Sequence, residues 1–150
     1  MLVFGNRAAG NDKLVTLVAQ SQEIVRVDVV AAQQAKNSNS AIQNLISTSS
    51  AILTSQQAEL TQYLKNNNIK VSKAKLNANI NKNTDTQLKS ASQNNNFDGV
   101  YLSYLKKQLN SYQTALQTAY KNAGKSGKVI LSKDFNSIKT LLSSSQFNTQ

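Results

Sequence analysis

Residues 97–123 read FDGVYLSYLKKQLNSYQTALQTAYKNA, and this stretch decides the fold class. Its apolar side chains recur at steps of three and four residues: Phe97, Val100, Tyr101, Tyr104, Leu105, Leu109, Tyr112, Leu116 and Ala119. This spacing places them on one wide face of an α-helix. The pattern therefore predicts a long amphipathic helix over residues 97–123, with Asn96 as its N-cap.

The same periodicity recurs in three other parts of the chain. It predicts helices over about residues 11–36 and 40–65, and a last helix from the N-cap Ser132 to about Gln146. Ser21 and Asp28 fall on the apolar stripe of the first of these helices. Turn-forming residues separate the helices, and the sharpest turn signal is Gly-Lys-Ser-Gly at 124–127. The chain has no Pro, so no residue of that type interrupts the helices.

Residues 69–96 are polar and rich in Lys and Asn. Loops of this length without any helix or strand are uncommon inside a compact domain, so we expect a crossing connection with one short helix. Asp85 favours a helix over about residues 84–92, because an acidic side chain stabilises a helix N-terminus. The expected fold is all-α, an antiparallel four-helix bundle in a single domain over residues 1–150, with residues 1–10 as a loose N-terminal segment.

The chain contains neither His nor Cys. It therefore lacks the usual acid/base group at neutral pH, the commonest nitrogen ligand of transition metals and any thiolate. Its acidic residues form no Glu-x-x-His pair, and there is no phosphate-loop, dinucleotide or hydrolase motif. We expect no enzyme activity, no catalytic residues, no metal site and no cofactor.

Two sets of residues on the predicted helices could still carry chemistry. Glu23 and Asp28 lie five residues apart, which is a poor spacing for sharing a ligand on one helix face. A surface Glu23 and a buried or rim Asp28 are therefore favoured over an acid/base pair. Four tyrosines and three lysines could instead form a stacking surface for single-stranded nucleic acid: Tyr101, Tyr104, Tyr112, Tyr120, Lys106, Lys107 and Lys121.

Core packing explains the tyrosines better than nucleic-acid stacking does. Tyr101, Tyr104 and Tyr112 share the apolar stripe of Leu105 and Leu109. We therefore expect their rings in the core and their hydroxyls at its rim. No nucleic-acid-binding motif accompanies them, so no specific nucleic-acid partner is expected.

Positive charge gathers in the polar connection and at its borders. Seventeen Lys and Arg against seven acidic residues give the chain a net charge of +10. Six candidate anion contacts are Lys65, Lys70, Lys73, Lys75, Lys82 and Lys89. A segment of this kind can bind anionic lipid, polysaccharide or nucleic acid, although a lysine run is more often simply solvated. No apolar run reaches the roughly 20 residues of a transmembrane helix.

Residues 23–71 read EIVRVDVVAAQQAKNSNSAIQNLISTSSAILTSQQAELTQYLKNNNIKV, and residues 97–116 read FDGVYLSYLKKQLNSYQTAL. Both stretches resemble the ferritin-like bacterial family catalogued as domain of unknown function 4142, whose members are mostly exported. The most specific piece is Phe97-Asp98-x-x-Tyr101. The resemblance implies a ferritin-like fold and a secreted or periplasmic location. It also implies that Phe97 and Tyr101 are core residues and that Asp98 is a first-turn charge.

The chain departs from that family at its histidines. Family members carry an Asp-His pair on the second helix, another on the third and a His near the end of the last. These positions fall on Ile52-Leu53, Gln108-Leu109 and Leu141, so the resemblance implies a degenerate member with inward leucines in place of the histidines. Leucine at these sites favours burial over ligand chemistry.

The sequence leaves three functions open. The favoured one is a non-catalytic structural or interaction protein, exported from a bacterium, that binds a protein partner or copies of itself. The alternatives are a basic binding module for anionic polymers or membrane surfaces, and a ferritin-like metal or redox protein.

Overall fold

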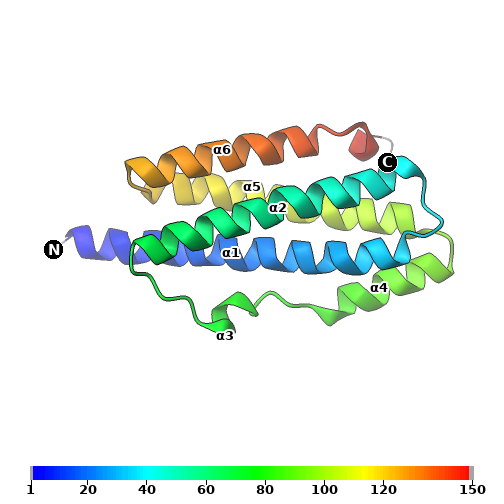
Figure 1. The fold of residues 1–150 in the computed structure, drawn as a ribbon, viewed down its shortest axis with the longest axis horizontal. Coiled ribbons are helices and arrows are strands. Elements are labelled where there is room, and N and C mark those ends of the chain that lie inside the picture. The colour runs from blue at the N-terminus through cyan, green and yellow to red at the C-terminus, as the bar shows by residue number, and fades with distance from the viewer. Residues whose placement is uncertain (1, 149–150) are drawn as a thin grey trace.

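The computed structural model describes the backbone of residues 2–148 and the side chains of residues 10–148. Over that range the chain forms α-helices and one 3₁₀ helix, with no strand, so the all-α prediction is confirmed. The elements are α1 (Leu2–Gln34), α2 (Ser40–Asn66), α3 (Lys73–Leu76), α4 (Lys82–Gln93), α5 (Phe97–Asn122), α6 (Lys125–Leu142) and η1 (Ser145–Asn148) (Figure 1).

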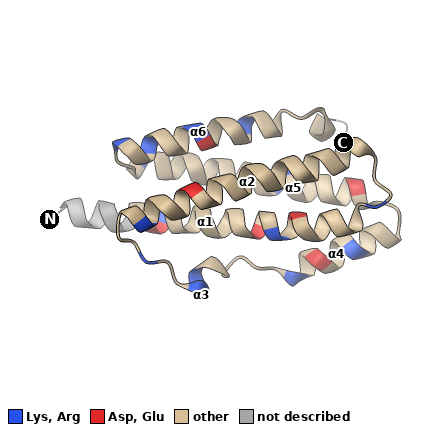
Figure 2. Ribbon diagram, viewed as in Figure 1, with Lys and Arg blue, Asp and Glu red and all other residues tan. Residues whose placement is uncertain are grey.

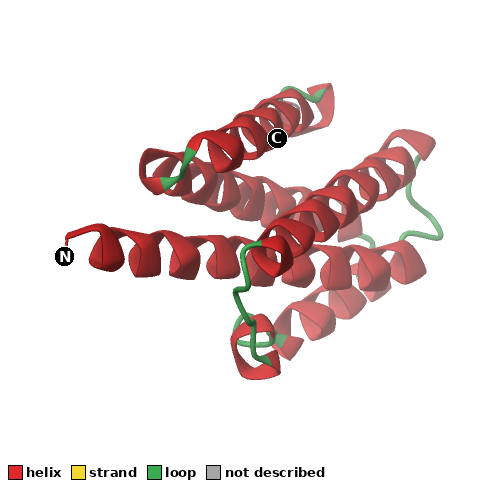
Figure 3. Ribbon diagram, turned by 60° about the vertical axis from the view of Figure 1, so that its left-hand side comes forward, coloured by secondary structure: helices red, strands yellow, loops and turns green. Residues whose placement is uncertain are grey.

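The long helices α1, α2, α5 and α6 lie side by side along the long dimension of the molecule (Figures 1 and 3). Helix α1 packs against α2 and α5, and α6 packs against α5 and α2. Short turns reverse the chain between α1 and α2 and between α5 and α6 (Figure 1). The connection from α2 to α5 instead returns along the whole length of the molecule. It carries α3 and α4, of which α3 lies against α1 and α4 against both α1 and α5.

Asparagine side chains and backbones define several helix ends. The Asn39 side chain accepts the N–H of Ile42 at 2.9 Å and so caps the start of α2. Asn68 and Asn95 both have φ of 58°, the left-handed conformation that Asn tolerates better than most residues. The residue after each of them donates its backbone N–H to a carbonyl oxygen of the preceding helix. For Ile69 this hydrogen bond is 2.9 Å long. The two turns that leave α2 and α4 therefore have the same closing geometry.

The apolar stripes of the helices meet in one continuous core. Leu53 on α2 and Leu109 on α5 have no exposed surface, and Leu141 on α6 is also buried. The inward direction predicted for these three leucines is confirmed. Ser21 and Asp28 are buried on the same face of α1, as their place on its apolar stripe predicted.

The prediction for the last helix is wrong at both ends. Helix α6 begins at Lys125 with Gly124 as its N-cap, so residues 125–127 are helical and Ser132 is no cap. Gly127 lies inside the helix because space is short there: a Cβ atom would come within 3.1 Å of Tyr63 Oη. The glycine at this position therefore lies at a tight helix contact and not in a turn. The helix ends at Leu142, and η1 follows it.

The other element bounds differ less. Helix α4 spans Lys82–Gln93 where 84–92 was predicted, and Asp85 lies in its first turn as expected. Helix α3 is a single turn that the sequence did not predict. The Ser72 side chain caps its start by accepting the Lys75 N–H at 3.2 Å. Helix α1 begins at Leu2 and not near residue 11. The side chains of residues 1–9 are outside the described range, so the looseness expected there stays a prediction.

Candidate functional site

A carboxyl group and a phenol meet in the core between α1 and α5. Tyr101 Oη donates a hydrogen bond of 2.7 Å to Asp28 Oδ1, and at most 1% of either residue is exposed. Burial raises the pKa of Asp28 to about 7, although the hydroxyls of Ser49 and Tyr101 lower it in part. Asp28 Oδ2 has no hydrogen-bond partner within the described structure. The predicted rim position of the Tyr101 hydroxyl is wrong, because this hydroxyl is buried on a carboxyl group.

A second buried carboxyl group lies on α6. Burial raises the pKa of Asp134 to about 7, and the carboxylate of Glu59 acts in the same direction. The backbone oxygen of Asp134 accepts a hydrogen bond of 3.3 Å from the Gln56 side chain, which joins α6 to α2. Tyr112 Oη is also buried, and among the described residues it has no partner. None of these groups lines the pocket described below.

The nucleic-acid stacking surface does not form. Tyr101 and Tyr112 have no exposed surface and cannot stack on a base, so their core packing is confirmed. Tyr120 is 42% exposed, and the Lys128 ammonium lies 5.1 Å from its ring centre.

Arg26 joins two carboxylates that lie far apart in the sequence. Its Nε and Nη2 each lie 2.8 Å from an oxygen of Glu23, and its Nη1 lies 2.8 Å from Asp85 Oδ2. The Asn81 N–H also donates to Glu23 Oε1, at 3.1 Å. These bonds fasten the start of α4 to α1. They also hold the pKa of Asp85 below its usual value.

The structure corrects the surface position predicted for Glu23. Only 7% of this residue is exposed, because Arg26 neutralises its charge at the boundary of the core. Glu23 and Asp28 have different partners, as the spacing of five residues predicted. The contact of Glu23 with the Asn81 N–H, 58 residues further along the chain, cannot be recognised from local periodicity.

The six lysines named from the sequence are all exposed. They follow the end of α2, the connection around α3, and α4, along one edge of the molecule (Figure 2). Two of them lie near acids: Lys75 is 3.7 Å from Asp12 and Lys82 is 3.8 Å from Asp85. For Lys65, Lys70, Lys73 and Lys89 the described structure shows no ion pair.

At the three positions where the resemblance predicts replaced histidines, the side chains are hydrocarbon. Leu53, Leu109 and Leu141 are packed in the core, and within residues 10–148 no three acidic side chains gather in a way that could hold a metal ion. No helix among the described residues is both long and apolar enough to cross a membrane.

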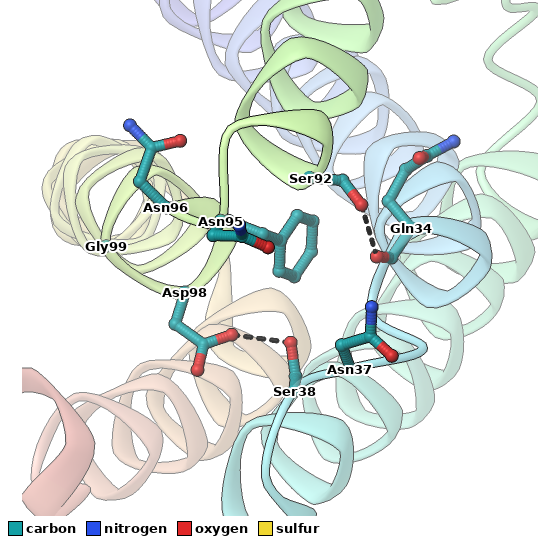
Figure 4. Close-up of a pocket in the computed structure, with 9 residues that line it drawn as sticks. Gln34, Asn37, Ser38, Ser92, Asn95, Asn96, Asp98 and Gly99 are labelled. Carbon is teal, nitrogen blue, oxygen red and sulfur yellow. Dashed lines mark hydrogen bonds between the residues drawn. The ribbon is translucent and has the colours of Figure 1, made fainter.

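A pocket of about 300 Å³ lies where the turn between α1 and α2 meets the turn between α4 and α5 (Figure 4). We call it the amide pocket. Its lining residues are Gln34, Asn37, Ser38, Ser92, Asn95, Asn96, Phe97, Asp98 and Gly99. Most of them carry an amide, hydroxyl or carboxylate group.

Two hydrogen bonds join the turns that form the amide pocket. Ser38 Oγ donates to Asp98 Oδ1 at 2.5 Å, and Ser92 Oγ donates to the Gln34 carbonyl oxygen at 3.0 Å (Figure 4). Phe97 supplies the apolar part of the lining. Its ring is stacked on that of Tyr101, with centroids 5.8 Å apart and planes inclined by 6°. The ring is thereby fixed from the core side.

Sequence reasoning missed this pocket. The asparagines and serines at positions 37, 38, 95 and 96 are of the types that form turns and helix caps. Asn96 precedes α5 as predicted, yet its side chain makes no capping bond. Nothing local in the sequence indicates that residues 37–38 and 95–98 come together, because about 60 residues separate Ser38 from Asp98.

Comparisons with protein-family models, with curated proteins and with solved structures give no match for this chain. The family resemblance of residues 23–71 and 97–116 therefore stays a prediction.

Proposed function

We propose that this protein is a non-catalytic structural or interaction protein, whose helical surface binds a protein partner or further copies of itself. The proposal rests on the partners of the buried ionisable side chains. Asp28 is engaged by Tyr101, and Glu23 by Arg26. The Asp28–Tyr101 bond joins α1 to α5, and Arg26, which also pairs with Asp85, links Glu23 to the start of α4.

We propose with it an antiparallel four-helix bundle of the ferritin-like kind. Its support is the pattern of helix contacts, in which α1, α2, α6 and α5 each touch the next and α5 touches α1. The single long connection between α2 and α5 also agrees, since ferritin-like bundles have one such crossover. Export from a bacterial cell belongs to the same proposal and rests on the composition and on the family resemblance.

Self-association is tested by size-exclusion chromatography with light scattering at two concentrations that differ a hundredfold. A mass that rises above 16.3 kDa with concentration supports association between copies. A constant monomer mass, together with no specific partner captured by the immobilised full chain, would contradict the proposal.

The distribution of acids favours a second candidate, a basic module for anionic polymers or membrane surfaces. Three of the seven acidic residues, Glu23, Asp28 and Asp134, are buried. The outer surface is therefore more basic than the net charge of +10 suggests. Positive charge of this kind attracts polyanions with a strong dependence on salt.

A matched pair of variants tests this second candidate. One replaces the six lysines of the connection edge with Gln, and the other replaces Lys36, Lys106, Lys107, Lys121, Lys125 and Lys139, which lie outside that edge. Both variants lose six charges, so a difference between them reports position and not net charge. Binding to heparin or anionic vesicles at about 50 mM salt should fall much further in the first variant. Equal losses would mean that no defined surface is involved.

A further inference from the structure

The amide pocket contains polar groups that the fold leaves unused. The side-chain amides of Asn37 and Asn95 make no hydrogen bond within the described structure, and both residues are exposed. Asp98 uses Oδ1 to accept from Ser38, while its Oδ2 has no partner among the described residues. Each amide offers two donors and one acceptor, and the free carboxylate oxygen offers an acceptor only. The pocket thus presents donors and acceptors together.

Donors and acceptors in one place match hydroxyl groups, because each hydroxyl both donates and accepts. The apolar component of the lining is the Phe97 ring, which is held in place by its packing. Phe97 is 95% buried, with 5% of its surface exposed, and Tyr101 supports it from the core side. This small apolar area beside hydrogen-bonding groups suits a ligand that carries C–H and O–H groups on the same small ring.

The charge of the pocket selects against ions. No lysine or arginine lines it, although the protein as a whole is strongly basic. Its one charged side chain is Asp98, whose carboxylate already accepts a hydrogen bond. An anion would meet that carboxylate without a compensating cation, and a cation would find only one acidic group. The lining therefore favours a neutral ligand.

We propose that the amide pocket binds a neutral polyhydroxylated ring, such as one unit of a saccharide. The volume of about 300 Å³ is at the lower end for ligand pockets and suits a single ring. This site goes beyond the proposed association through the helical surface. The two can fail separately, because the pocket is tested with a small molecule and without any partner.

The test is a titration of ¹⁵N-labelled protein with methyl glucoside and with N-acetylglucosamine, followed by amide chemical shifts. We expect saturable shifts of the Asn37 and Asn95 side-chain amides and of backbone amides in residues 92–99. The half-saturating concentration should be about 1–10 mM, as expected for a ligand held by a few hydrogen bonds.

Two variants remove the amides without disturbing the fold. Asn95→Gly keeps the left-handed conformation, which glycine adopts at no cost. Asn37→Ala changes an exposed side chain that makes no hydrogen bond within the described structure. Each should weaken binding by about 3- to 10-fold, the value of one net hydrogen bond. The matched control is Asn68→Gly, which makes the same change at the same φ of 58° in the turn after α2. This control should bind like the parent protein.

Three outcomes would overturn the proposal. They are no saturable shift with either sugar at about 20 mM, an affinity loss in Asn68→Gly equal to that in Asn95→Gly, and stronger binding of inorganic phosphate than of the sugars at the same amides. Shifts that appear with the sugars, and that are reduced by Asn37→Ala and Asn95→Gly but not by Asn68→Gly, would support it.

Discussion

Tyr101 Oη and Asp28 Oδ1 lie 2.7 Å apart in the core and join α5 to α1. Tyr112, three turns further along α5, is equally buried, but its hydroxyl has no partner within residues 10–148. The two tyrosines therefore present the same ring in the same helix with and without a hydrogen bond. They allow the value of that bond to be measured inside one protein.

Replacement of Tyr101 by Phe should lower the free energy of unfolding by about 1–3 kcal/mol, because Asp28 loses its donor in a buried site. Replacement of Tyr112 by Phe should leave stability unchanged or raise it, since it removes a buried hydroxyl that has no partner. Urea unfolding at constant pH measures both changes. Equal losses in the two variants would show that the hydrogen bond contributes nothing beyond packing.

The protein should become less stable as the pH rises from about 4 to about 7. Asp28 and Asp134 have a pKa of about 7 in the fold against 3.8 when unfolded, so the folded state holds more protons in that interval. Their contribution is fully present below pH 3.8 and is lost as the pH rises through about 7. The slope is at most about 1.4 kcal/mol per pH unit for each group. Asp85 has a lowered pKa and adds no slope in this window.

Unfolding free energies at several pH values test this dependence. Asp28→Asn removes one titrating group while it keeps the shape of the side chain, so the slope should fall by about half. Asp134→Asn should remove much of the remainder. A parent protein whose stability is flat or rises over this pH range would contradict the assignment.

Loss of the Arg26 guanidinium should be costly. Arg26→Met leaves the buried Glu23 without its cation, and breaking a buried pair on one side typically costs about 3–5 kcal/mol. The start of α4 is also released from α1, so hydrogen exchange should quicken in residues 79–93 more than in α2. Glu23→Met in the same chain should restore part of the stability, because no unpaired charge then remains.

The control for this prediction is an ion pair on the surface. Lys133 pairs with Glu59, and the lysine is 62% exposed. Lys133→Met should change stability by less than about 1 kcal/mol. If the two substitutions cost the same, Arg26 does not act through a buried charge.

Leu109 should be a full core residue. Leu109→Ala should cost about 2–5 kcal/mol through lost burial and the cavity that remains. Val129→Ala, at a site 67% exposed, should stay within about 0.5 kcal/mol. Thermal or urea unfolding compares them, and a small loss at Leu109 would argue against the inward packing of this helix face.

Local periodicity predicted the features that depend on the burial of one helix face. It failed where the partners of a side chain come from elsewhere in the chain. The spacing of apolar residues placed Leu109 in the core and predicted the start of α5 at Phe97, because one helix face must exclude water. It could not predict that Glu23 is buried, since the cation that permits this also binds Asp85, 59 residues after Arg26. Gly127 was misleading for another reason: a glycine at a tight helix contact has the same sequence signature as a glycine in a turn.

The amide pocket has a similar origin in long-range contacts. Asn37 and Asn95 are each accounted for locally by turn chemistry, and only the fold brings their two turns together. Sequence could therefore predict the residues of the candidate site as turn residues but not as a site.

Because α1 packs against helices that are synthesised after it, part of its apolar face stays uncovered during synthesis. Helix α1 leaves the ribosome first, but it packs against α2, α3, α4 and α5. When α2 has emerged at Asn66, the chain still lacks the 56 residues to Asn122 that complete α5. Synthesis at about 5–20 residues per second takes roughly 3–11 s over that distance. For those seconds the hairpin of α1 and α2 carries an apolar stripe that α5 covers in the complete fold.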